Sequence, residues 1–503
     1  MNIVPLLMLV ACLQVELPAI CYEAKDMPEA AADALPRWRG FNLLEKFIQG
    51  MSSAGPFQEQ DFQLISELGF NFVRLPMDYR FWIVNGDWEQ INEEAFDDLD
   101  QAVEFGARYN IHVCMNFHRA PGHTVAKPSE PTSLWEDPET QRVCALHWRY
   151  FARRYKGVPN RLLSFNLFNE PHGVSGHVYA DVVRTMAEAI WAEDPDRLII
   201  ADGLWWGAFP CKELFAMPIA QAARGYQPMG LTHYKAGWVE GADRYPVPEW
   251  PVRCIGGGFL YGSMKKELKS ALKIHTNFKE PVLLVVTVGE VSHHARLVAR
   301  IDGEEKHALS FTPGPGEGPW QESTFYEEYN SYKARYDQDI TVPIPAGKHE
   351  AALDVDDGDW LSLTRVALRD ETGEYDSISI IPKWGEPNAT ISTNPESRRF
   401  QTAQEQNAAW LWEKHFKRWA DLREQGIGVM VGEWGAFNET NHDVVLRWME
   451  DSLKTFRRAG IGWALWNFRG AFGILDSGRK DVEYESFHGH QLDREMLEML
   501  RRY

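Results

Sequence analysis

The chain reads FNLFNEPH from Phe165 to His172 and VMVGEWG from Val429 to Gly435. Each stretch is a short apolar run that ends on a glutamate, Glu170 in the first and Glu433 in the second. Such runs are typical of buried strands in a parallel sheet. Because parallel barrels carry their chemistry at the C-terminal ends of the strands, both acidic side chains are placed where a reaction would occur.

Working outward from these stretches, short β-branched or aromatic runs predict eight strands. They span residues 38–43, 71–75, 111–118, 162–169, 197–202, 229–234, 427–433 and 462–467. Helical spacing of apolar residues separates most of them, for example over residues 93–109, 138–155 and 178–193. This alternation predicts an α/β fold, a parallel (β/α)8 TIM barrel.

The pattern of apolar and polar residues changes between the sixth and seventh predicted strands. Alternating runs broken by PGPGEGP (313–319) and DVDDGD (354–359) predict an inserted all-β module, a β-sandwich or jelly-roll-like fold. The predicted domains are a signal-like segment and linker (1–36), the first part of the barrel (37–253), the insert (254–385) and the second part of the barrel (386–503).

Two features of the insert each leave two interpretations open. A group of aromatic residues forms either a stacking platform for sugar rings or ordinary packing under a loop: Trp320, Phe325, Tyr326, Tyr329, Tyr332 and Tyr336. An aspartate group either binds calcium or forms a turn between strands: Asp354, Asp356, Asp357 and Asp359.

The composition excludes several partners. Lys plus Arg number 52 against 72 Asp plus Glu, so the net charge of −20 repels nucleic acids and anionic lipid surfaces. A neutral polysaccharide is indifferent to that charge, and 13% aromatic residues suit stacking on sugar rings or packing in a core. The six Cys and 16 His show no spacing typical of metal ligands, so we expect no metal and no cofactor.

The first residues, MNIVPLLMLVACLQ, resemble a short signal sequence that is too short to span a bilayer. We expect no integral membrane span and a secreted or extracytoplasmic protein, with lipid anchoring at Cys12 as a further possibility. The alternative is an irregular extension on a cytoplasmic enzyme.

Glycosidic bond cleavage needs one carboxyl to protonate the leaving oxygen and a second to attack the anomeric carbon. Glu170 and Glu433 supply this pair. Other polar residues near the predicted strand ends suit supporting roles, with Asn169 gripping a sugar hydroxyl, Arg74 keeping Glu433 ionised and Trp466 forming a floor. The structural alternative is that residues such as Arg74, His118 and Trp466 only complete a buried core.

The chain resembles glycoside hydrolase family 5, the cellulase family, across about residues 38–247 and 386–501. The motifs that carry the resemblance are RGFNL (39–43), FVRLP (72–76), NFHRAPG (116–122), FNEP (168–171), THY (232–234), GEWG (432–435) and WALWNF (463–468). The resemblance implies a retaining reaction with Glu170 as acid/base and Glu433 as nucleophile. It also implies that the substrate-binding residues are Arg74, His118, Asn169, His233, Tyr234 and Trp466.

The expected substrate is a β-linked oligo- or polysaccharide, cleaved by an endo-β-1,4-glucanase. The first alternative is an exo-acting β-glucosidase or β-mannosidase, or a β-1,3-glucanase, with the insert blocking the cleft. A non-catalytic glycan-binding protein and a metalloenzyme are alternatives of other classes.

Overall fold

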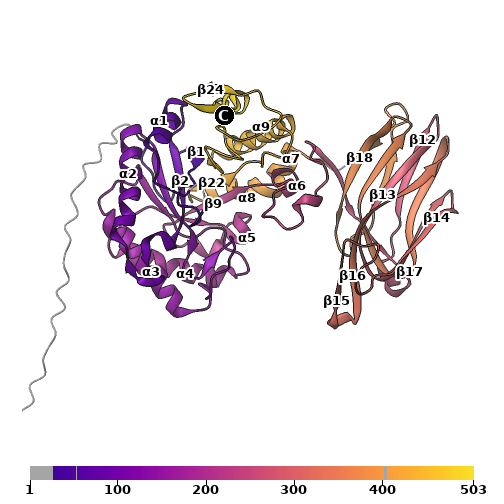
Figure 1. The fold of residues 1–503 in the computed structure, drawn as a ribbon, viewed down its shortest axis with the longest axis horizontal. Helices are drawn as coiled ribbons and strands as arrows, with labels where there is room; N and C mark the ends of the chain where they lie inside the picture. The colour runs from indigo at the N-terminus through magenta and orange to yellow at the C-terminus, as the bar shows by residue number, and fades with distance from the viewer. Residues whose placement is uncertain (1–26, 52–53, 402–404) are drawn as a thin grey trace, which may run out of the picture. The chain divides into compact units, whose positions relative to one another are not determined.

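The computed structural model describes residues 27–51, 54–401 and 405–503 (Figure 1). The described residues form two compact units: one comprises residues 27–239 with 412–503, and the other comprises residues 240–411. The predicted signal sequence and the possible lipid anchor at Cys12 lie outside the described residues. Within the described part of the chain, no helix is both long and apolar enough to cross a membrane.

The first unit contains a closed barrel of eight parallel strands. They are β1 (Arg39–Asn42), β2 (Phe72–Asp78), β5 (His112–Ala120), β7 (Leu163–Asn166), β8 (Ile199–Asp202), β9 (Ala220–Gly225), β22 (Val429–Trp434) and β23 (Gly462–Leu465). The order is β2-β1-β23-β22-β9-β8-β7-β5, and the pairing of β2 with β5 closes the ring. The predicted TIM barrel is therefore confirmed.

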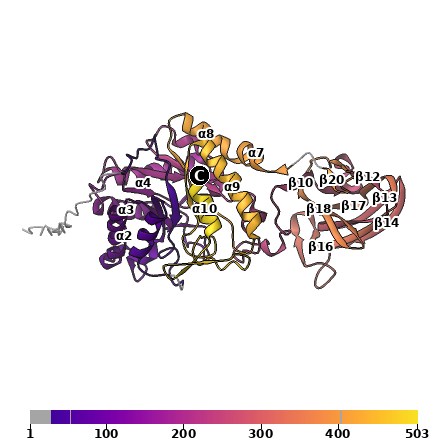
Figure 2. The same ribbon diagram turned by 90° about the horizontal axis from the view of Figure 1, so that it is seen from above.

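Helices surround this barrel in both ribbon views (Figures 1 and 2). The longer ones are α1 (Glu59–Glu67), α2 (Asp97–Tyr109), α3 (Pro138–Arg154), α4 (Gly176–Trp191), α8 (Lys417–Glu424), α9 (His442–Ala459) and α10 (Arg494–Arg502). Local sequence fixes their ends. Asp137 accepts hydrogen bonds from the backbone N–H groups of Glu139 and Thr140 at the start of α3, whereas Gly460 ends α9 in the left-handed conformation.

Shorter elements lie in the connections between strands and helices. They are the helices α5 (Leu204–Gly207) and α6 (Met229–Thr232) and the strands β3 (Ile83–Val84), β4 (Asp87–Ile91), β6 (His123–Thr124), β24 (Glu485–Phe487) and β25 (His490–Leu492).

The sixth barrel strand differs from the prediction. Residues 229–234 were expected to form it, but Met229–Thr232 is a short helix that begins after Pro228, and the strand is β9 with the sequence AQAARG. Small residues are required there, because a Cβ atom on Gly225 would lie 2.8 Å from the Cβ of Trp434. The tight contact between β9 and β22 thus explains a strand without the usual β-branched residues.

The second unit is rich in strands. They are β10 (Val252–Gly257), β11 (Phe259–Tyr261), β12 (Leu272–Phe278), β13 (Val282–Ile301), β14 (Glu304–Phe311), β15 (Glu322–Tyr326), β16 (Ser331–Ile344), β17 (Gly347–Asp370), β18 (Gly373–Pro382), β19 (Thr390–Thr393), β20 (Phe400–Gln401) and β21 (Glu405–Gln406), followed by the helix α7 (Ala408–Leu411). Alternate residues of β13 and β17 point into one apolar core, as the sequence alternation predicts.

This unit interrupts the barrel between its sixth strand, β9, and its seventh, β22. It is wider than the predicted range of 254–385, because β10 pairs with β18 and β19 pairs with β12. The flanking segments are therefore held by strand pairing within the strand-rich unit rather than by the barrel.

Candidate active site

Both glutamates identified in the sequence lie at the C-terminal end of the barrel. Glu433 is the penultimate residue of β22 and is 3% exposed. Glu170 follows β7 after a short connection. Parallel strands end at the same rim of a barrel, so the two carboxyl groups open onto a common space.

One arginine joins the two glutamates. The Nε of Arg224 in β9 donates to Oε1 of Glu170 at 3.1 Å, and its Nη2 lies 3.2 Å from Oε1 of Glu433. A guanidinium is a small rigid plane, so two carboxyls that contact it cannot point into separate regions. Arg224 therefore holds the carboxyl groups of Glu170 and Glu433 close to each other.

Glu433 is surrounded by donors. Its Oε1 accepts a hydrogen bond from Nη1 of Arg74 at 2.6 Å, and its Oε2 accepts one from the hydroxyl of Tyr226 at 3.1 Å. Two guanidinium groups and a phenol hydroxyl therefore hold the Glu433 carboxyl in one orientation. A fixed orientation is what a nucleophilic carboxylate needs.

Glu170 has the opposite electrostatic setting. Burial and the nearby charge of Glu433 raise the pKa of Glu170 to about 8, although Arg224 opposes this shift. A count of charges agrees, because two buried guanidiniums, Arg74 and Arg224, face three carboxyls, those of Glu170, Glu433 and Asp202. With one proton on Glu170 the cluster is electrically balanced.

The backbone of Glu170 is strained. Its φ is +53°, in the left-handed region that non-glycine residues rarely adopt. The N–H of Glu170 donates to Oδ2 of Asp202 at 2.9 Å, and that oxygen also pairs with Arg224. Strain held by such contacts is typical of functional sites, where it fixes the direction of a side chain.

Asn169 presents a free amide donor beside the acids. Its Oδ1 accepts hydrogen bonds from Arg74 and Arg224, each at 2.8 Å. Its Nδ2 is buried and has no hydrogen-bond partner among the described residues. Because a buried donor without a partner is costly, Nδ2 is suited to bind a ligand oxygen such as a sugar hydroxyl.

His118 and Trp466 form an aromatic side of the site. Their ring centroids lie 5.8 Å apart, and the ring of Phe47 packs edge-on against both. Burial lowers the pKa of His118 well below its usual value, so the imidazole is neutral. Trp466 is only partly buried, which leaves ring surface for a ligand.

The sequence motif THY identifies a different tyrosine from the one in contact with Glu433. Tyr226, just after β9, donates to Glu433. Tyr234 is partly exposed, and the Lys235 ammonium lies over its ring. His233 packs edge-on against Tyr226 with ring centroids 5.0 Å apart. The tyrosine in contact with Glu433 is therefore Tyr226, which the sequence analysis did not name, and the substrate-binding role of Tyr234 stays a prediction.

Besides Tyr226, the sequence analysis missed Arg224 and Asp202, which contact the two glutamates or their backbone. Asp202 is the last residue of β8, so a strand-end position could have identified it. Arg224 lies in a strand that was not predicted. Gly207 of α5 packs directly on it, because a Cβ on Gly207 would lie 2.6 Å from Cγ of Arg224.

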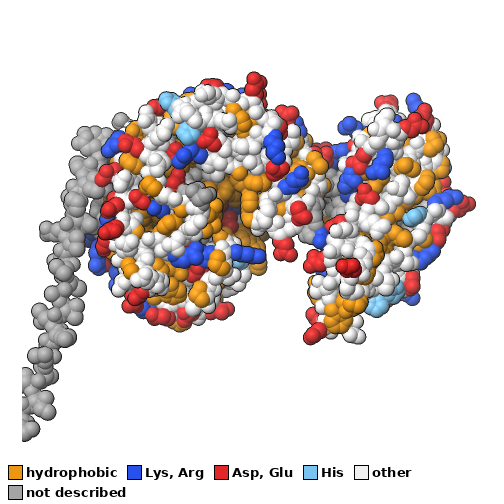
Figure 3. Space-filling view, in the orientation of Figure 1, with side chains coloured by type: hydrophobic (Ala, Val, Ile, Leu, Met, Phe, Trp, Pro, Cys, Tyr) orange, Lys and Arg blue, Asp and Glu red, His pale blue; other side chains and the backbone are white. Residues whose placement is uncertain are grey.

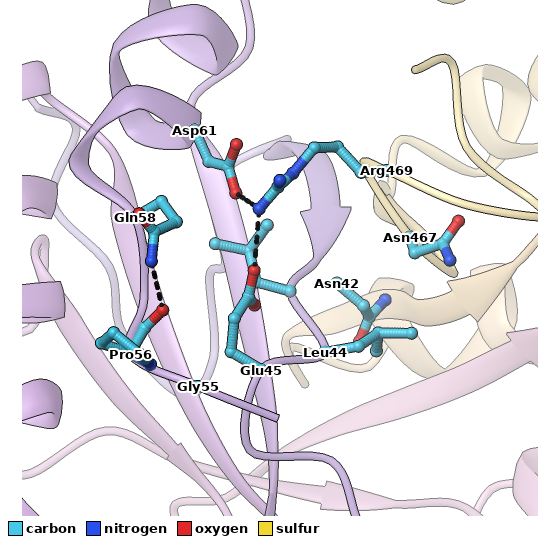
Figure 4. A pocket seen from close by; sticks show the side chains of 10 residues that line it. Asn42, Leu44, Glu45, Gly55, Pro56, Gln58, Asp61, Asn467 and Arg469 are labelled. Atoms are coloured by element: carbon cyan, nitrogen blue, oxygen red, sulfur yellow. Dashed lines mark hydrogen bonds and ion pairs between the residues drawn. The ribbon is translucent and has the colours of Figure 1, made fainter. Parts of the chain in front are cut away.

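A polar pocket of about 330 Å³ lies beside the ends of β1 and β23 (Figure 4). Nη2 of Arg469 donates to Asp61 at 2.6 Å and to Oε1 of Glu45 at 3.2 Å, while Asn467 connects the pocket to Trp466. Burial and the Asp61 carboxylate raise the pKa of Glu45 to about 7, and Arg469 opposes the shift. The lining suits a hydroxyl-rich ligand rather than an apolar one.

The described residues contain no group of three or more His, Cys, Asp or Glu side chains that could hold a metal ion. The aspartates of the sequence DVDDGD lie in β17 and pair with cationic side chains of the same unit. Asp356 contacts Arg296 at 2.5 Å, and Asp354 contacts Lys269 at 3.3 Å. These carboxylates therefore form ion pairs with cationic side chains of the protein.

Comparison with known proteins shows which family the barrel sequence is similar to. The family model described as Cellulase (glycosyl hydrolase family 5) matches residues 30–229. The chain is 28% identical over 191 residues to Endoglucanase C of Acetivibrio thermocellus, which covers 37% of this chain and 55% of that protein. It is 26% identical over 251 residues to Endoglucanase 3 of Fibrobacter succinogenes, which covers 45% of this chain and 37% of the relative. The chain thus spans about half the length, or less, of these curated relatives.

Solved structures agree with this fold. The crystal structure of a glycoside hydrolase is similar over 93% of this chain and 99% of its own, with 27% identity and a TM-score of 0.60. Thermotoga maritima Cel5A in complex with mannotriose is similar over 92% of this chain and 97% of its own, with 15% identity and a TM-score of 0.52. The second likeness concerns the fold alone.

Proposed function

The barrel of this chain belongs to glycosyl hydrolase family 5, and from that premise we propose that the protein is a retaining β-glycan hydrolase, an endo-β-1,4-glucanase. Glu170 is the acid/base and Glu433 the nucleophile. The observation that carries the proposal is the Arg224 bridge, which holds the carboxyl groups of Glu170 and Glu433 beside each other. That is the arrangement a double displacement requires.

In the first step a carboxylate oxygen of Glu433 attacks the anomeric carbon while the glycosidic C–O bond breaks. The proton of Glu170 moves to the departing oxygen, so the leaving sugar is a neutral alcohol. The product on the enzyme is a glycosyl ester of Glu433. Arg74 and Tyr226 keep the attacking carboxylate oriented through hydrogen bonds of 2.6 and 3.1 Å.

In the second step Glu170, now ionised, takes a proton from water as that water attacks the anomeric carbon. The ester bond to Glu433 breaks, and the sugar leaves with its original configuration. Nδ2 of Asn169 donates to the sugar 2-hydroxyl, a contact that strengthens as positive charge develops on the ring. Trp466 supplies the apolar floor under that ring.

Several observations support a polymeric β-glucan as substrate. Two of the similar curated proteins are named endoglucanases, and the acidic chain suits a neutral polymer. The signal-like segment at residues 1–14 fits an enzyme exported to such a substrate. The polar pocket at Glu45 supplies binding surface in addition to the site around the two glutamates.

The test compares reducing-sugar release with loss of viscosity on soluble cellulose, for the enzyme and for Glu433→Gln. An endoglucanase lowers viscosity early, because internal cuts shorten the chain sharply, and the variant does neither. Sugar release without loss of viscosity favours the exo-acting alternative. No release from any β-linked polysaccharide or oligosaccharide contradicts the proposal.

A further inference from the structure

A hairpin in the strand-rich unit carries exposed aromatic side chains. It is formed by β15 and the start of β16, with the turn at residues 327–330. Phe325, Tyr326 and Tyr329 are 44%, 39% and 69% exposed. Figure 3 shows hydrophobic atoms beside acidic ones at this end of the unit, which Figure 1 labels β15.

Packing explains only part of the aromatic group that the sequence analysis identified. Tyr336 is buried in the core of the unit, and Trp320 packs against that core. Phe325 and Tyr332 are direct cross-strand partners with ring centroids 5.0 Å apart, a pair that stabilises the hairpin itself. Tyr326 and Tyr329 belong neither to that core nor to this pair, and each keeps exposed surface.

Tyr326 and Tyr329 are therefore available to a ligand. Tyr326 has the Lys333 ammonium 5.5 Å from its ring centre, and the residues between the two tyrosines are Glu327 and Glu328. The tip thus combines flat apolar rings with phenol, ammonium and carboxylate groups. Several exposed aromatic side chains close together on one hairpin mark an interaction site rather than ordinary surface.

We propose that this hairpin tip, residues 325–332, is a binding site for β-linked glucan chains, separate from the catalytic barrel. The inference rests on the proposed function, because the ligand is taken to be the polymer that the barrel cuts. Equatorial hydroxyls leave C–H groups on the faces of each glucosyl ring, and these stack on aromatic faces. The hydroxyls at the ring edge bind phenol and carboxylate oxygens.

The charge of the tip favours a neutral polymer over an anionic lipid surface. Glu322, Glu327 and Glu328 lie on the hairpin against the single Lys333 in residues 322–333. Anionic headgroups would be repelled. A carbohydrate hydroxyl pays no such electrostatic penalty and accepts or donates at each of these groups.

Trp384 offers a matched control on the same unit. It is 51% exposed, but its ring packs edge-on against Phe259, Tyr261 and Trp360, with centroids 5.1 to 5.6 Å apart. Gly385, its neighbour, also donates to the Tyr261 hydroxyl at 2.7 Å. We therefore assign Trp384 to covering these aromatic residues, not to glycan binding.

The test measures depletion of the protein from solution by amorphous cellulose. Parent, Tyr326→Ala/Tyr329→Ala and Trp384→Ala all carry Glu433→Gln so that the polymer is not digested. The double variant should bind cellulose about tenfold more weakly than the parent. Each tyrosine ring that stacks on a sugar contributes a modest binding free energy, and the variant lacks both rings. Trp384→Ala should bind within about twofold of the parent.

Three further measurements make the outcome decisive. The double variant should keep the parent's thermal midpoint, and in the active enzyme it should cleave a soluble aryl cellobioside as fast as the parent does. Equal cellulose binding by parent and double variant overturns the inference, as does loss of binding by Trp384→Ala alone. Binding to phosphatidylcholine vesicles that the double variant loses, with cellulose binding unchanged, would assign the tip to membranes instead.

The same panel separates failure of the inference from failure of the proposed function. An active enzyme that cleaves β-glucan, with cellulose binding unaffected by the hairpin substitutions, refutes only the hairpin site. If the enzyme with Glu433 intact cleaves no β-glycan, the proposed function is refuted, and the hairpin assignment is refuted with it.

Discussion

The proposed catalytic cluster of the barrel and the aromatic hairpin of the strand-rich unit differ in how each presents its side chains. Around Glu433 each carboxylate oxygen has a fixed donor, and the side chains are almost entirely buried. At the hairpin tip the rings of Tyr326 and Tyr329 are exposed. Bond cleavage needs preorganised charge, whereas holding a polymer needs surface that many registers of the chain can use.

This contrast predicts that substitutions in the cluster change catalysis and substitutions at the tip change polymer binding. The largest effect is expected from Glu433→Gly, which removes the attacking carboxylate. Turnover of every substrate should fall by about 10⁵-fold, the scale of losses when a covalent nucleophile is removed. Azide should restore part of the reaction and give a glycosyl azide of inverted configuration, observed by NMR.

For Glu433→Gly, binding to cellulose should stay close to that of the parent, since the hairpin is intact. Normal hydrolysis without azide would show that Glu433 is not the nucleophile. Loss of both cellulose binding and activity would contradict the assignment of catalysis to the cluster and of polymer binding to the hairpin tip.

Glu170→Gln should separate substrates by their leaving groups. Cellulose and alkyl glycosides, which need protonation to leave, should lose about 10³-fold in kcat/KM, the scale of general acid catalysis. Dinitrophenyl glycosides, which depart as stable anions, should lose less than about tenfold in the rate of the first step. Equal losses on both substrates, measured before steady state, would contradict the role of Glu170.

Arg224→Lys should lower kcat by about 100-fold, because the single ammonium nitrogen of a lysine cannot reproduce contacts that Arg224 makes from separate nitrogens, Nε to Glu170 and Nη2 to Asp202 and Glu433. Arg197→Lys is the matched control, since Arg197 is also buried in the barrel but donates to backbone oxygens and Asp194. The control should lower the thermal midpoint and leave kcat near the parent value. Equal kcat losses in both variants would reduce Arg224 to a structural residue.

The smallest expected effect is on the pH profile. The pKa of Glu170 is raised to about 8, so the acid is protonated below that pH and loses its proton above it. The value of kcat/KM on cellulose oligosaccharides should therefore fall about tenfold per pH unit above pH 8. The Tyr326→Ala/Tyr329→Ala variant should show the same pH profile. A change in the pH at which its kcat/KM begins to fall would show that the hairpin tip affects catalysis.

The sequence was sufficient for the barrel fold and for the position of both glutamates at strand ends. Seven of its predicted strands coincide with barrel strands of the structure, because the apolar runs that formed them are buried on both faces. Glu170 and Glu433 were recognisable because each follows such a run directly. Arg74 and Asn169 could be predicted for the same reason, as polar residues in or next to an apolar strand.

The sequence was insufficient for β9 and therefore for Arg224. The run AQAARG lacks the residues that usually indicate a strand, and its small side chains reflect contact with Trp434 across the sheet. Tyr226, which follows this strand, was missed with it. These omissions share one cause, a strand defined by tertiary packing rather than by local propensity.

The most direct test of the central claim is to trap the covalent intermediate. The enzyme is incubated with a dinitrophenyl 2-deoxy-2-fluoro-β-cellobioside, whose fluorine slows the second step, and the labelled peptide is sequenced by mass spectrometry. We predict one glycosyl ester per chain on Glu433. A label on Glu170 or another carboxylate, or hydrolysis with inverted configuration, would contradict the assignment.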